Sequence, residues 1–174
     1  MTPTWSPALF FWSATRRKFP DPDANTVSSG LIVVMMLSLI GVVMSPAKRS
    51  DWKNEPMPAS SKALDFGAVY TPEEFRKITR GLIPEAMEDK WFIYYDEPWL
   101  YLHRSWTGYC IYKVRFRECP EGFEVAEALV NREQSQYTET DDESDVRLLK
   151  ILLESRAGRD VRQQMIDHIR RLKQ

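Results

Sequence analysis

Chemical motifs are scarce in this chain. Its 174 residues include two histidines, two cysteines and seven glycines. No glycine-rich phosphate loop, metal-ligand spacing or paired-carboxylate motif occurs, so the sequence assigns no catalytic residue, metal or cofactor. Excess charge is lacking as well, because the formal net charge is −1. Since strong nucleic-acid binding needs a clear basic excess, we do not expect a nucleic-acid partner.

Charged residues are missing altogether from residues 24–47, which contain the apolar run LIVVMMLSLIGVVM at positions 31–44. A helix rises about 1.5 Å per residue, so this uncharged stretch is long enough for a hydrocarbon core about 30 Å thick. A helix buried on one side of a soluble domain would keep a polar stripe, and this run has none. We predict a single transmembrane helix at residues 27–47, which makes the membrane a partner.

Two other interpretations of the apolar run stay open: it is a cleaved export signal, or it lies before the true start of translation. Arg16 and Arg17 partly resemble the start of a twin-arginine export signal, although Asp21 and Asp23 interrupt the pattern. Translation starting at Met57 would omit the run and leave a soluble cytoplasmic protein. Basic residues are slightly more frequent just after the run than before it. This asymmetry favours a single-pass topology with a cytoplasmic C-terminal domain.

Composition divides the remaining chain into three parts. Residues 1–26 are rich in proline and tryptophan without periodicity, and they predict a disordered or interfacial tail. Residues 48–63 contain Pro56 and Pro58 and predict a linker. Residues 64–174 are long enough for one hydrophobic core and are expected to form a folded domain.

The pattern within residues 64–174 predicts an α+β fold: a short helix, a three- to four-stranded antiparallel meander and two C-terminal helices. Capping boxes beginning at Thr71 and Thr140 mark two helix starts. The last helix is expected over residues 160–173. Aromatic and β-branched residues predict strands at 90–96, 99–105, 109–118 and 123–131. Their short connections imply antiparallel pairing, with the helices covering one face.

Strand alternation gathers basic and aromatic side chains near the third strand. Tyr109, Lys113 and Arg115 are expected on one face of it, and His103 and Arg104 lie on the neighbouring strand. Arginine holds a phosphate or carboxylate through paired hydrogen bonds, and aromatic rings stack beside such groups. These five residues therefore predict a site for a small anionic ligand or a protein partner. The alternative is a solvated sheet face on which neighbouring acids pair with the bases.

Catalysis has weaker support. His103 with Ser105, or with Cys110, is a nucleophile–base pairing that strand geometry permits, but such spacing arises often by chance. His168 lies among charged residues and is expected at the surface. The leading hypothesis is therefore a membrane-anchored binding or interaction module. The alternative is a soluble enzyme or nucleotide-binding protein centred on His103 and Arg104.

One segment carries a family resemblance. Residues 91–116, WFIYYDEPWLYLHRSWTGYCIYKVRF, contain the core HRSWTG at positions 103–108. This segment resembles small uncharacterised bacterial proteins that share the same core. The resemblance implies an independent domain from about Leu64 onward. It implies no activity, so it assigns no site residues.

Overall fold

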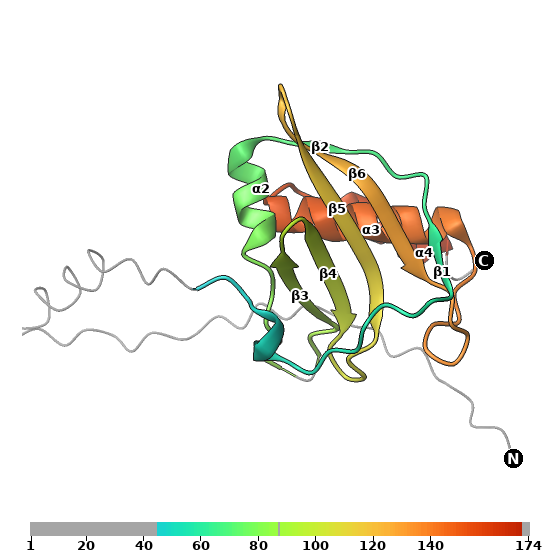
Figure 1. The fold of residues 1–174 in the computed structure, drawn as a ribbon. Coiled ribbons are helices and arrows are strands. Elements are labelled where there is room, and N and C mark those ends of the chain that lie inside the picture. The colour runs from blue at the N-terminus through green and yellow to red at the C-terminus, as the bar shows by residue number, and fades with distance from the viewer. Residues whose placement is uncertain (1–44, 87, 172–174) are drawn as a thin grey trace, which may run out of the picture. The chain divides into compact units, whose positions relative to one another are not determined.

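The computed structural model describes residues 45–86 and 88–171, which form an α+β domain with an antiparallel sheet and three α-helices (Figure 1). The predicted transmembrane residues before position 45 lie outside this part, whereas residues 45–47 are described and are not helical, so the predicted end of the transmembrane helix at residue 47 is wrong. Among the described residues, no helix is long and apolar enough to cross a membrane. The elements are η1 (Arg49–Asp51, a 3₁₀ turn), β1 (Ser61–Ala63), β2 (Val69–Tyr70), α2 (Pro72–Thr79), β3 (Trp91–Asp96), β4 (Trp99–Arg104), β5 (Cys110–Cys119), β6 (Gly122–Asn131), α3 (Asp142–Ala157) and α4 (Arg162–Arg171).

Strands β3 to β6 form the predicted antiparallel meander, with the fourth strand present. The sheet order is β1-β6-β5-β4-β3, and β2 also pairs with β6. Strands β1 and β2 were not expected from the sequence. They are three and two residues long, too short for alternation to be visible, and they depend on the edge of β6 for their hydrogen bonds.

Local signals explain where the helices start. Helix α2 begins as predicted, because the Thr71 side chain accepts from the Glu74 N–H and the Glu74 carboxylate accepts from the Thr71 N–H. At α3 the expected cap at Thr140 is wrong by one residue. Asp141 is the N-cap, and its carboxylate accepts from the N–H groups of Glu143 and Ser144. Both patterns satisfy N–H groups that a helix terminus leaves unpaired.

Helix α3 lies across one face of the sheet (Figure 1). The main core fills this space: Leu100 and Leu102 from β4 and Leu149 and Leu153 from α3 are fully buried. Burying one such side chain contributes roughly 1.5–3 kcal/mol to folding. Tyr112 of β5 is also buried. The helix side is therefore the better-packed side of the sheet.

Part of the expected linker, residues 48–63, packs on the fold. Strand β1 lies within this segment, and the Trp52 indole donates to the Ser105 carbonyl (2.8 Å). The Glu55 N–H donates to the Gly108 carbonyl (2.8 Å). Just before the segment, Ala47 is 4% exposed and packs with aromatic residues of β3 on the other side of the sheet. Residues from 47 onward thus contribute contacts to the domain, which a chain starting at Met57 would lose.

Candidate functional site

The sheet separates the five residues expected to form one anion site. Arg104 and Tyr109 lie on the helix side, where Arg104 covers the Trp91 ring and Tyr109 packs against the main core. His103, Lys113 and Arg115 lie on the opposite face. Alternation sends neighbouring positions of β4 to opposite faces. A bulge at Leu102/His103 shifts the register with β5, so that Tyr109 no longer shares a face with Lys113.

The opposite face has the features of a structural surface. His103 is 1% exposed and packs beside Phe92, Tyr94 and Tyr101. Its Nδ1 lies 2.9 Å from the Gly108 carbonyl oxygen, and burial lowers the pKa of the imidazole. These contacts hold the ring in place, and its Nε2 is buried without a hydrogen-bond partner among the described residues.

The basic residues of this face already have partners. The Lys113 ammonium lies 4.0 Å from the centre of the Trp99 ring, an arrangement favoured by the ring quadrupole. Arg115 forms an ion pair with Glu127 (3.0 Å), across the β5–β6 pair. Cross-strand pairs of this kind match the alternative expectation of a solvated sheet face.

Neither nucleophile–base pairing has the geometry for catalysis. Ser105 is 2% exposed, and its hydroxyl donates to the Asp89 carbonyl oxygen (2.5 Å). Cys110 pairs with His103 across the strands, but burial raises the pKa of its thiol to about 12. Since the thiolate is the reactive form, Cys110 is poorly suited to act as a nucleophile near neutral pH.

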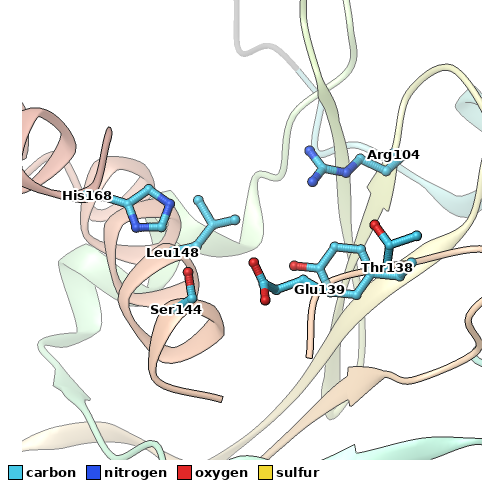
Figure 2. Close-up of a pocket in the computed structure, with 7 residues that line it drawn as sticks. Arg104, Thr138, Glu139, Ser144, Leu148 and His168 are labelled. Atoms are coloured by element: carbon cyan, nitrogen blue, oxygen red, sulfur yellow. The ribbon is translucent and has the colours of Figure 1, made fainter. Parts of the chain in front are cut away.

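A polar pocket of about 300 Å³ lies on the helix side. Its walls are Arg104 from β4, residues 137–139 from the connection between β6 and α3, Ser144 and Leu148 from α3, and His168 from α4. Figure 2 shows the Arg104 guanidinium and the His168 imidazole on opposite sides of this space, with the Glu139 carboxylate between them in this view. The walls thus combine the guanidinium of Arg104, the carboxylate of Glu139 and the imidazole ring of His168.

Arg104 is the main cation of the pocket. Its guanidinium carbon lies 4.3 Å from the centre of the Trp91 ring, a contact that the ring quadrupole favours. Burial lowers its pKa, yet an arginine starts so high that it stays charged at neutral pH. Among the ion pairs formed by the described residues, none includes Arg104. Arg104 also lines a neighbouring pocket of about 290 Å³ with Ser105 and Thr107.

A buried network holds the wall beside Arg104. The hydroxyls of Tyr112 and Tyr137 both donate to Asp145 Oδ1 (2.6 Å each), and the Arg132 guanidinium lies 2.7 Å from Asp145 Oδ2. Asp145 is fully buried. Burial, with the adjacent Asp145 charge, raises the pKa of both phenols, so they remain donors. The network therefore joins β5, the β6–α3 connection and α3 at the pocket.

His168 and Glu139 complete the pocket. His168 was expected at the surface, and this expectation is wrong: it is 7% exposed because it lies on the face of α4 turned toward α3. Burial and the nearby Arg147 lower its pKa, so the ring is neutral at pH 7. Its Nδ1 is buried without a hydrogen-bond partner among the described residues. Glu139 Oε1 accepts from the N–H groups of Thr140 and Asp141 (2.9 Å each).

Sequence reasoning found Arg104 but missed the other pocket residues. The face on which Arg104 lies could have been predicted, because Leu100, Leu102 and Arg104 are alternate residues of one strand and alternate residues share a face. Glu139 and His168 come from segments far from β4 in the sequence, and only the packing of α3 and α4 brings them together. Nothing in a single sequence indicates that Asp145 is buried on an otherwise ordinary amphipathic helix.

The fold and the pocket define an α+β domain with a small polar pocket beside α3 and α4. The described residues contain no group of three or more side chains suited to hold a metal ion. No protein-family model matches the chain, and neither the curated proteins nor the solved structures contain a significant match.

Proposed function

We propose that this domain is a ligand-binding module that holds a small anionic group on Arg104 in the pocket between β4, α3 and α4. The observation that carries the proposal is the state of Arg104. Its guanidinium is oriented by Trp91 and faces a pocket, yet it forms no ion pair within the described part of the chain. The Trp91 ring and the nearby Asp145 carboxylate offset this charge in part, and a bound carboxylate or phosphate would add the paired hydrogen bonds that a guanidinium can donate.

The volume of the pocket limits the size of the ligand. Its volume of about 300 Å³ is at the lower end of known small-molecule sites. A metabolite with one carboxylate or one phosphate fits this space better than a nucleotide does. The planar guanidinium binds such a group through two parallel hydrogen bonds.

Calorimetric titration of the full chain, in a non-ionic detergent, tests the proposal with acetate and inorganic phosphate as probes. We expect saturable binding of at least one probe, and Arg104→Gln should weaken it at least about tenfold, as loss of a charge-assisted pair predicts. The melting temperature of this variant should fall only modestly, because the contact with the Trp91 ring is lost but no ion pair is.

Arg115→Gln is the matched control. Arg115 lies on the other face of the sheet and is 46% exposed in its ion pair with Glu127, so its loss should leave binding unchanged. Equal binding by the parent and Arg104→Gln, or loss of binding in Arg115→Gln, would contradict the proposal.

The apolar run supports a second part of the proposal: the module is held at a membrane by a single-pass anchor, with the domain on the cytoplasmic side. Because Ala47 packs in the domain, the anchor would comprise residues before it. The uncharged residues 24–44 would extend about 31 Å as a helix, enough to span a hydrocarbon core.

Cell fractionation tests the anchor. The full chain should sediment with membranes and resist a high-salt wash. Replacing both Val34 and Leu39 with Arg should release it, since each charge at the membrane centre costs about 2.5–3.5 kcal/mol. The control Val34→Leu with Leu39→Ile should stay in the membrane fraction. Full-length parent protein in the soluble fraction would rule out the anchor.

A further inference from the structure

The pocket holds two opposite charges that do not neutralise each other. Arg104 and Glu139 both line it, but no ion pair between them occurs among the described residues. In Figure 2 both side chains point into the same space from different elements. Two opposite charges on the walls of one pocket can each contact one end of a ligand that carries both charges. The arrangement is therefore complementary to a ligand that has separate positive and negative ends.

Glu139 has the capacity to bind a cation. Its Oε1 atom is occupied by the N–H groups of Thr140 and Asp141, which fix the carboxylate. No hydrogen bond of Oε2 is present among the described residues. A carboxylate has about four acceptor sites, so Glu139 can still accept from an ammonium group. Its half-buried position strengthens such an interaction compared with one in bulk water.

The remaining walls suit a small organic molecule. Leu148 supplies apolar surface, while Ser144 and His168, which are 6% and 7% exposed, supply polar groups. The buried Nδ1 of His168 is unpartnered in the described part of the chain.

We infer that the ligand is a small zwitterion of the amino-acid type, with its carboxylate on Arg104, its ammonium on Glu139 and its side chain against Leu148. This inference rests on the proposed function, because it takes Arg104 as the anion-binding group. It adds a second charged contact, between the ligand's ammonium group and Glu139, and thereby specifies the class of ligand. A simple carboxylate fills only the Arg104 half of the pocket and leaves Glu139 unpaired.

Titration of the full chain with the common L-amino acids tests this inference. The tightest one is then compared with its des-amino carboxylate and with its decarboxylated amine. We expect the amino acid to bind at least about tenfold more tightly than either analogue, since each loses one charge-assisted contact. The same analogue series with Arg104→Gln and Glu139→Gln assigns each end of the ligand.

Glu139→Gln should reduce amino-acid affinity to that of the des-amino carboxylate, while the affinity for the carboxylate stays the same. Glutamine keeps an acceptor for the Thr140 and Asp141 N–H groups, so the loop should retain its shape. Glu143→Gln is the matched control, because Glu143 is an exposed residue of the first turn of α3 that does not line the pocket.

The outcomes separate this inference from the proposed function. If the des-amino carboxylate binds at Arg104 as tightly as the amino acid, and Glu139→Gln changes neither, the zwitterion is wrong while the anion site stands. If neither amino acids nor carboxylates bind in an Arg104-dependent way, both proposals fail.

Discussion

Single residues in this domain have roles set by the face of the sheet on which they lie. His103 and Arg104 are neighbours in the sequence, and the sequence predicts one site for both. In the structure, His103 is surrounded by aromatic rings and Arg104 faces a pocket. We therefore expect substitution of His103 to affect stability and substitution of Arg104 to affect binding.

His103→Ala should lower the free energy of unfolding by about 2–4 kcal/mol, because it leaves a cavity beside Phe92 and Tyr94 and removes the bond to Gly108. Urea denaturation measures this loss, and acetate binding should not change. Unchanged stability together with lost binding would show that His103 belongs to the site.

The same residue predicts a pH dependence. Burial keeps the folded-state pKa of His103 below its ordinary value of 6.5. As the pH falls below about 6.5, the unfolded chain takes up a proton that the folded chain does not, so stability decreases until the lower folded pKa is reached. His168 contributes with the same sign. Urea midpoints between pH 8 and pH 5 should therefore fall less in His103→Ala than in the parent; equal slopes would contradict this assignment.

At the scale of elements, the Asp145 network joins β5, the β6–α3 connection and α3 at one side of the pocket. Asp145→Asn leaves Arg132 without its buried anionic partner, and we expect it to lower the free energy of unfolding by about 3 kcal/mol. Asp142→Asn is the control. Asp142 contacts the same Arg132 but is 42% exposed, so its loss should cost less than about 1 kcal/mol. Equal losses in thermal or urea unfolding would contradict a special role for Asp145.

The elements also show what the sequence can and cannot predict. The meander and α2 are local: alternation, turn residues and a capping box specify them within a few positions. Strand β1 depends on β6, which lies far along the chain, through the pairing of Ser61 with Asn131, and no local signal marks it. The face on which Tyr109 lies depends on the bulge between β4 and β5. A bulge changes which residues share a face but leaves no mark in the residue composition, so the sequence does not predict it. Arg104 was singled out from the sequence, but the residues that line the pocket with it come from tertiary packing.

At the scale of the whole molecule, the two sides of the sheet differ. One side carries α3, the main core and the Arg104 pocket. The other carries the segment from Ala47 to Glu55 together with paired surface charges. A ligand that binds the pocket contacts β4, α3 and α4 together. Ligand binding should therefore raise the melting temperature of the domain by mass action.

The proposed binding of the anionic end of a ligand by Arg104 is tested most directly by the nuclear magnetic resonance signal of the Arg104 side-chain Nε–H. The signal is assigned by its disappearance in Arg104→Lys and followed while acetate, and then the tightest amino acid, is added to the full chain. We expect this signal to shift and saturate along the calorimetric binding curve, while the Arg115 signal stays in place. An Arg104 signal that does not move while the probes bind would contradict the account.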